Sequence, residues 1–261
     1  MLKTRFFTAV AALMLVAIVL FAVPPLYTEV IIGLLMLAGA WEWSGLIDKD
    51  KTGVRVVYTA IIGACLALAH AATAGQAAVI LQVACAWWFV AFLWTLRFPT
   101  PIPAVVRWIC GLLVIVPLFV ALYTLLRLGV AYLIAVLFIV WFADGGAYFA
   151  GKAFGRVKLA PAISPGKTWE GVVGGLALVA VLAVGIGIWQ KLDIAVLLPF
   201  FLAVAAISIV GDLTVSMFKR TAGVKDSGSL FPGHGGVLDR VDSVAAASPL
   251  FALGLKALGI A

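Results

Sequence analysis

The stretch WICGLLVIVPLFVALYTLL, residues 108–126, decides the fold class of this protein. It contains no Asp, Glu, Lys or Arg, and its length is close to the run of about 20 apolar residues that an α-helix needs to cross a bilayer. The whole chain shares this character, because 65% of its 261 residues are hydrophobic and only 11% are charged. Such a composition argues against a water-soluble globular domain. We therefore expect an all-α polytopic integral membrane protein.

Further apolar stretches on both sides of this one predict about nine transmembrane helices. Their ranges are 6–23, 30–46, 56–73, 76–94, 108–126, 129–150, 169–189, 194–211 and 243–260. The connections are short and leave no room for a separate soluble domain. We expect residues 1–261 to form a single membrane domain, with five helices within residues 1–128 and four within residues 129–261.

The basic residues are distributed unevenly among the connections, and this bias predicts the orientation of the chain. With a cytoplasmic N-terminus, fifteen of the 18 Lys and Arg residues fall in cytoplasmic segments, and only Arg127, Lys191 and Lys256 do not. The formal net charge of +7 suits anionic lipid headgroups or anionic substrates, and favours them over nucleic acid.

The cysteines predict no cross-link or zinc site, and the N-terminal apolar run predicts a transmembrane helix rather than a cleaved signal peptide. Cys65, Cys85 and Cys110 lie inside apolar runs, far apart in sequence, so we expect no disulfide or zinc framework. Lys3 and Arg5 precede the first apolar run as in a secretory signal, but no small-residue cleavage site follows it. We expect a retained first span.

Two cytoplasmic loops, residues 151–168 and 212–242, combine glycines with charge, and we expect the chemistry there. If the eighth helix continues past the bilayer, Asp212, Ser216 and Lys219 share one face; if the ninth begins early, Asp239 and Asp242 do too. Two acidic helix ends joined by a Gly-rich segment can close on a hard cation such as Mg²⁺. That ion keeps waters and takes substrate phosphates as further ligands.

Each of these residues also has a simpler interpretation. Lys and Arg at a cytoplasmic helix end commonly only determine topology. The run Gly233-His234-Gly235-Gly236 serves either as a flexible turn or as backbone that lets N–H groups approach phosphate oxygens.

The other loop ends in SPGKTWEG, residues 164–171, which contains the Gly-Lys-Thr of a Walker A motif. That motif needs a further glycine where Pro161 stands, and a preceding strand, so we reject a nucleotide-binding P-loop. Lys167, two hydroxyls and an acid remain at the start of the seventh helix, where the helix dipole favours an anion. Ordinary capping by Thr168 with Glu170 is the alternative.

Ionisable groups inside apolar spans are functional candidates by default. Asp144 precedes Gly145-Gly146 near the cytoplasmic end of its span, so we expect it to face the same cavity as the loops. Glu42, between two tryptophans, approaches that side too, although pairing with a neighbouring helix explains it equally well. His70 lies in an Ala- and Leu-rich span and is interpreted as a packed residue rather than a ligand.

The second loop resembles the signature of the CDP-diacylglycerol synthase (phosphatidate cytidylyltransferase) family. The matching positions are Ser216, Lys219-Arg220, Lys225-Asp226, Pro232-Gly233-His234-Gly235-Gly236, Asp239-Arg240 and Asp242. About a dozen fixed positions at fixed spacing are far more specific than a short nucleotide motif. Residues 164–171 and the run Asp144-Gly145-Gly146-Ala147-Tyr148 also look like segments of this family, so the resemblance covers roughly the C-terminal half.

The resemblance implies a reaction of CTP with phosphatidate that gives CDP-diacylglycerol and pyrophosphate. It also implies that Asp212 and Asp239 coordinate Mg²⁺, either alone or beside a second cation. The residues that it implies for catalysis are Lys167, Lys219, Arg220, Lys225, Asp226, His234, Arg240 and Asp242. Those that it implies for binding the nucleotide and metal are Asp144, Ser164, Thr168, Glu170 and Ser216. The lipid phosphate is itself the nucleophile, so positioning and charge neutralisation are the tasks left to the protein.

The resemblance also implies a location in the cytoplasmic (inner) membrane, a site open to both lipid and cytosol, and a homodimer. Two alternatives need a similar membrane site. A CTP-dependent kinase of a polyprenol or similar alcohol would also use a basic, metal-binding site, but the full signature favours cytidylyl transfer. A transporter of a phosphorylated solute would place functional charges at mid-membrane depth, whereas most charges here lie at one face.

Overall fold

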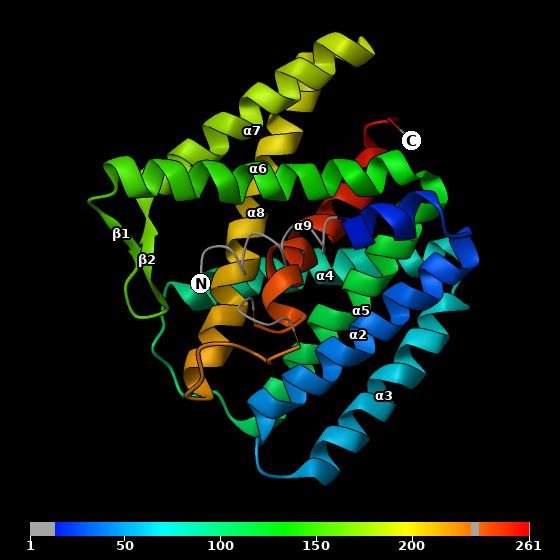
Figure 1. Ribbon diagram of the computed structural model, residues 1–261, viewed down its shortest axis with the longest axis vertical. Coiled ribbons are helices and arrows are strands. Elements are labelled where there is room, and N and C mark those ends of the chain that lie inside the picture. Colours follow the sequence, from blue (N-terminus) through cyan, green and yellow to red (C-terminus); the bar gives the residue numbers. More distant parts are fainter. Residues whose placement is uncertain (1–13, 231–234, 261) are drawn as a thin grey trace.

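The computed structural model describes residues 14–230 and 235–260, and it is built almost entirely of helices (Figure 1). A helical segment, residues 14–21, precedes the labelled elements. The long helices are α2 (Pro25–Ile47), α3 (Thr52–His70), α4 (Ala74–Thr95), α5 (Ala104–Leu128), α6 (Val130–Phe154), α7 (Trp169–Gln190), α8 (Ile194–Thr221) and α9 (Leu238–Ala257). The all-α class predicted from composition is confirmed.

Seven of these helices, α2 to α8, are long and apolar enough to cross a membrane. They coincide with the second to eighth predicted spans. The first span lies partly outside the described residues, since only 14–23 of its 6–23 are described, of which 14–21 are helical. Helix α9 forms where the ninth span was expected but is not among the seven, and its first turns carry Asp239, Arg240 and Asp242. The total of nine spans therefore stays a prediction, as does the side of the N-terminus.

A short antiparallel hairpin joins α6 to α7, where only a loop was expected. Its strands are β1 (Lys158–Ala160) and β2 (Ser164–Thr168), with Lys158 opposite Thr168 and Ala160 opposite Ser164. Strands of three and five residues are too short to show a sustained alternation of apolar and polar residues, so the usual sequence signal is missing. The hairpin matters because β2 carries Lys167.

Glycines set how closely the helices around the site approach one another. A Cβ atom at Gly146 of α6 would come within 2.8 Å of the Gly174 carbonyl oxygen of α7. At Gly211 of α8, it would collide with the Asp242 carbonyl oxygen and approach Ala246 of α9 to 2.9 Å. Small residues allow helix backbones to pack this closely in membranes. The packing at Gly211 brings the carboxylate-bearing turns of α8 and α9 together.

Helix α5 is the most buried of the candidate spans and holds α2 and α3 in place. The indole N–H of Trp43 on α2 donates to the Arg107 carbonyl oxygen over 2.8 Å, and the Arg107 guanidinium donates to the Leu46 carbonyl oxygen over 2.5 Å. Trp43 and Tyr58 both pack against Gly111, where a side chain would leave them no room. All three cysteines are free, as predicted.

Candidate active site

An ion pair between α8 and α9 lies at the centre of the polar site. Helix α8 continues to Thr221 and α9 begins at Leu238, so both helices extend beyond the spans expected from hydropathy and meet the condition under which their polar residues share a face. The Lys219 ammonium lies 2.6 Å from Oδ1 of Asp239, and the two side chains are only 8% and 6% exposed. The charged ends of the two helices therefore close on each other, as expected.

The other oxygen of Asp239 organises the segment that links the two helices. Oδ2 accepts hydrogen bonds from the Ser227 backbone N–H (2.9 Å), the Ser227 hydroxyl (3.0 Å) and the Gly236 N–H (2.9 Å). Burial alone would raise the pKa of Asp239, but the hydrogen bonds from Lys219, Gly236 and Ser227 outweigh it and hold that pKa below its usual value. Asp239 therefore stays ionised in neutral solution.

Glu42 of α2 anchors the same segment from the other side, which is a contact with a neighbouring helix, one of the two alternatives given for it from the sequence. Its Oε1 accepts from the Val237 N–H, and its Oε2 accepts from the Leu238 N–H and the Ser227 hydroxyl, at 2.9 to 3.0 Å. The carboxylate thus caps the N-terminus of α9. The one available signal was an acid inside an apolar span, which is costly unless it has partners.

These contacts also explain two glycines of the connecting segment. A Cβ atom at Gly236 or at Gly228 would collide with the Glu42 carboxylate. The Gly236 N–H is already bonded to Asp239, so it is not a free donor for phosphate. Residues 231–234, including His234, lie outside the described residues, so the predicted role of that histidine stays a prediction.

A second Lys–Asp pair joins the hairpin to α8. Lys167 of β2 lies 2.5 Å from Oδ2 of Asp212, and both side chains are 27% exposed. The Ser216 hydroxyl, one helical turn further along α8, donates to Oδ1 of Asp212 over 3.1 Å. This pair is more accessible to solvent than the Lys219–Asp239 pair, and it brings the two predicted loops together.

Two further acids lie within electrostatic range of Asp212. One is Asp144, an exposed residue of α6, which also lies near the charges of Lys167 and Arg240. The other is Asp242, whose pKa is raised, first by burial and then by the negative charge of Asp212. Asp144 therefore faces the loops, as expected.

Several of the remaining predicted residues make structural contacts. Thr168 accepts from the Gly171 N–H and so caps α7, and the Glu170 carboxylate accepts from the Val157 N–H at 3.1 and 3.2 Å. Arg220 donates to the carbonyl oxygens of Ile163 and Val224, which ties the hairpin to α8. The Thr168 hydroxyl therefore caps α7 in this structure, as the capping alternative from the sequence proposed. A substrate role for these residues stays a prediction, as it does for Ser164, Lys225 and Asp226.

The carboxylate oxygens around Asp212 are suitable ligands for a hard cation, although the described residues contain no preformed metal site. Among residues 14–230 and 235–260, no group of three or more His, Cys, Asp or Glu side chains is arranged to hold a metal ion. Nevertheless, the described part of the cluster contains four carboxylates, those of Asp144, Asp212, Asp239 and Asp242, and three cations, Lys167, Lys219 and Arg240. Carboxylate oxygens in excess of positive charge are the ligands that Mg²⁺ prefers.

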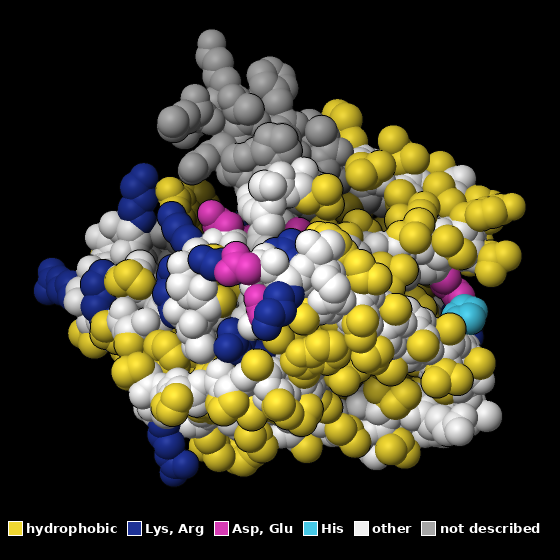
Figure 2. Space-filling view, turned by 90° about the horizontal axis from the view of Figure 1, so that it is seen from below, with side chains coloured by type: hydrophobic (Ala, Val, Ile, Leu, Met, Phe, Trp, Pro, Cys, Tyr) yellow, Lys and Arg dark blue, Asp and Glu magenta, His cyan; other side chains and the backbone are white. Residues whose placement is uncertain are grey.

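On the face drawn in Figure 2, most of the Lys, Arg, Asp and Glu side chains lie in the middle and left of the view. Hydrophobic side chains occupy most of the right side and the lower part of that face. The lower end of the molecule in Figure 1 contains the C-terminal end of α8 and the connection between α2 and α3. Apolar helices with clustered lysines and aspartates at one end define a polytopic membrane protein with a charged site at that end.

Comparison with known proteins narrows this class. A sequence model described as the cytidylyltransferase family matches residues 3–258, so the chain belongs to the cytidylyltransferase family. A phosphatidate cytidylyltransferase of Pseudomonas aeruginosa is 42% identical over 269 residues, which cover 99% of this chain and 98% of that protein. A phosphatidate cytidylyltransferase of Haemophilus influenzae is 37% identical and covers 96% of this chain and 97% of its own length.

Proposed function

We propose that this protein transfers the cytidylyl group of CTP to phosphatidate, giving CDP-diacylglycerol and pyrophosphate in phospholipid biosynthesis. Two relatives that match almost the whole chain carry the name of this activity. The structural observation that carries the proposal is the pair of Lys–Asp contacts, Lys167 with Asp212 and Lys219 with Asp239, brought together from β2, α8 and α9.

The reaction requires positioning of two phosphates more than it requires a nucleophilic side chain. A phosphate oxygen of phosphatidate attacks the α-phosphorus of CTP, the bond to the β-phosphate breaks, and pyrophosphate leaves with its electrons. Lys167 and Lys219 supply positive charge on two sides of the site, where they orient the anions and offset their repulsion. Arg240 adds a third cation at the exposed surface.

A divalent cation such as Mg²⁺ fits the acidic cluster and would neutralise charge on the triphosphate. Asp212 and Asp239 are the ligands that we propose, and Asp144 and Asp242 lie within electrostatic range of Asp212. We also propose that the protein lies in the cytoplasmic membrane with its site on the cytosolic side, an orientation that the positive-inside bias favours. A homodimer stays a prediction.

Product analysis tests the proposed reaction. The purified protein, reconstituted with phosphatidate and supplied with CTP and Mg²⁺, should release pyrophosphate and form CDP-diacylglycerol. Release of CDP instead would indicate a lipid kinase and overturn the proposal, as would the absence of both products across several lipid compositions. Removal of divalent cations with a chelator should abolish turnover, and added Mg²⁺ should restore it.

A matched pair of variants tests the site itself. Asp239→Asn should lose most of the activity, because it removes the charge that pairs with Lys219. Asp193→Asn is the control: Asp193 caps the other end of α8 through a 2.8 Å hydrogen bond from the Ala195 N–H. The control should keep its turnover number. Full activity of folded Asp239→Asn would contradict the assignment.

A further inference from the structure

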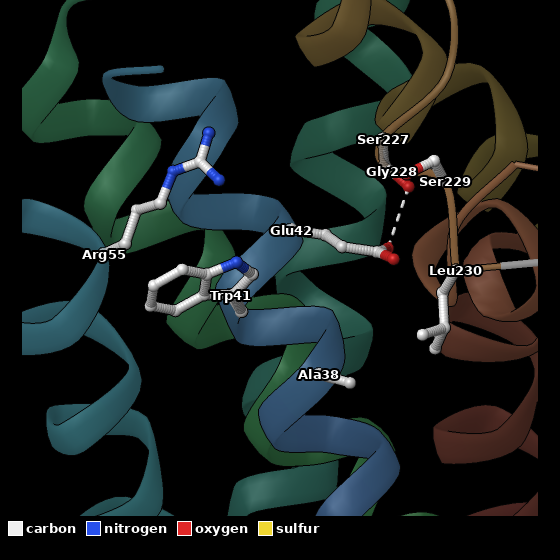
Figure 3. Close-up of a pocket in the computed structure, with 8 residues that line it drawn as sticks. All are labelled: Ala38, Trp41, Glu42, Arg55, Ser227, Gly228, Ser229 and Leu230. Atoms are coloured by element: carbon white, nitrogen blue, oxygen red, sulfur yellow. Dashed lines mark hydrogen bonds between the residues drawn. The ribbon is translucent and has the colours of Figure 1, made fainter. Parts of the chain in front are cut away.

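A pocket of about 590 Å³ opens between α2, α3 and the segment that follows α8 (Figure 3). Trp41 and Ala38 of α2, Arg55 of α3, and Leu230 of the connecting segment line it. Figure 3 shows Glu42 pointing across the pocket toward Ser227, away from Arg55. None of the pocket's lining residues is a fixed position of the signature, although residues 227–230 lie within its loop.

The Arg55 guanidinium is held in place at the pocket and forms no ion pair with an acid in the described part of the chain. Its guanidinium lies over the Trp41 ring, 5.6 Å from the ring centre, and donates to the Lys49 carbonyl oxygen over 3.2 Å. No Asp or Glu in the described part of the chain forms an ion pair with it. A guanidinium has five donors and binds phosphate in a forked geometry. Among residues 14–230 and 235–260, Arg55 donates only to the Lys49 carbonyl oxygen.

The pocket has an apolar side that continues onto the outer surface of α2. Trp41 is 39% exposed and Leu230 is 58% exposed, while Leu34, about two turns before Trp41 on α2, is 60% exposed. Hydrophobic side chains so exposed on a membrane helix contact lipid. A ligand with a charged head and an apolar body therefore fits this pocket along its length.

The polar side of the pocket leads directly to the ion pair between α8 and α9. The Ser227 hydroxyl lies in the pocket wall and bonds to Glu42 and to Asp239, which in turn holds Lys219. A ligand phosphate beside Arg55 would thus adjoin the proposed reaction centre. The Glu42 carboxylate points away from Arg55 (Figure 3), and its negative charge is partly offset by three hydrogen bonds and by the N-terminus of α9.

We propose that this pocket binds the phosphate monoester headgroup of the lipid substrate, with Arg55 contacting the phosphate and Trp41 and Leu230 contacting the glycerol and the first acyl carbons. This inference rests on the proposed function and assigns its lipid subsite. One cation matches a phosphate monoester, whereas a nucleoside triphosphate carries more charge than Arg55 alone can offset. The triphosphate fits the cluster around Lys167 and Asp212 better.

Separate Michaelis constants for the two substrates test the assignment. Arg55→Gln should raise the KM for phosphatidate by about tenfold or more, since a charge-assisted hydrogen bond is lost. The KM for CTP should stay within about twofold of wild type, a change too small for the loss of such a bond. Arg97→Gln is the matched control, because Arg97 also lines a hollow beside a tryptophan, Trp94. That control should leave both constants unchanged.

A conservative variant separates a binding role from a structural one. Arg55→Lys keeps the charge but not the fork, so its KM for phosphatidate should lie between wild type and Arg55→Gln. It also keeps the test informative if Arg55→Gln folds poorly. An unchanged KM for phosphatidate, an equal rise in both constants or a rise for CTP alone would overturn the inference. An inactive wild type would overturn the proposed function instead.

Discussion

The substitution Glu42→Gln should show that a helix outside the signature holds the active site in its working geometry. The carboxylate accepts three hydrogen bonds, from two backbone N–H groups of α9 and from the Ser227 hydroxyl. In the amide, one oxygen becomes an NH₂ group, which then faces a donor. The variant therefore loses at least one hydrogen bond to a charged acceptor and leaves a buried donor without a partner.

The magnitude follows from the type of contact. Loss of a helix cap costs about 0.5–2 kcal/mol, and loss of a hydrogen bond to a charged group costs about 1.5–3 kcal/mol. We expect the free energy of unfolding to fall by roughly 2–4 kcal/mol. The first turn of α9 carries Asp239, so its loosening should also lower kcat by about tenfold, which corresponds to about 1.4 kcal/mol in the transition state.

The assay measures kcat with both substrates saturating, alongside thermal unfolding in the same detergent. Glu29→Gln is the control, since Glu29 is the other buried acid of α2 and pairs with Arg127 at 2.8 and 2.9 Å. It lies about 20 Å away along the helix. Glu29→Gln should lose comparable stability but keep its kcat. An unchanged kcat in Glu42→Gln, or equal losses of kcat in both variants, would refute the reasoning.

Three further outcomes follow from the same contacts. Gly236→Ala should lower kcat as strongly as Glu42→Gln does, because the added Cβ atom would collide with the Glu42 carboxylate. Gly75→Ala, whose Cβ atom would meet nothing within 4 Å, should leave kcat unchanged in the same assay. Lys219→Met should cost about 3–5 kcal/mol in unfolding experiments, because it leaves Asp239 buried and unpaired, while Lys51→Met, at a pair whose lysine is 72% exposed, should cost at most about 1 kcal/mol. The pKa of Asp239 in the folded protein is lowered from 3.8, so its ionised form should stabilise the fold fully above about pH 5. This stabilisation should disappear as the pH falls through the folded-state pKa. A stability difference between wild type and Asp239→Asn that persists unchanged at low pH would contradict this.

The helices were predictable from sequence because a membrane span is specified locally. An uninterrupted apolar run such as residues 108–126 has only one way to satisfy its backbone in lipid. The shared faces at Asp212 and Asp239 follow from residue spacing once each helix extends, but the extensions themselves were only a condition of that prediction. The hairpin at Ser164–Thr168 was not predictable, since its strands are too short for periodicity to appear.

The parts of the site that depend on distant contacts were only partly predictable. Asp144 could be placed near the loops from its depth in the span. The partners of Glu42 could not be inferred, because nothing in the sequence near it specifies the backbone groups of Val237 and Leu238. The hydrogen bond from the Gly236 N–H to Asp239 could not be predicted either, because it depends on the conformation of the Asp239 side chain.

The cap on α9 has a consequence for how this protein is made. Glu42 and Leu238 are 196 positions apart, so the bond between them forms only after Leu238 has been synthesised and has left the ribosome. Until then α2 carries this acid without its partners on α9. Assembly of the active site therefore waits for the synthesis of α9, and a chain truncated before α9 should be inserted into the membrane yet remain inactive.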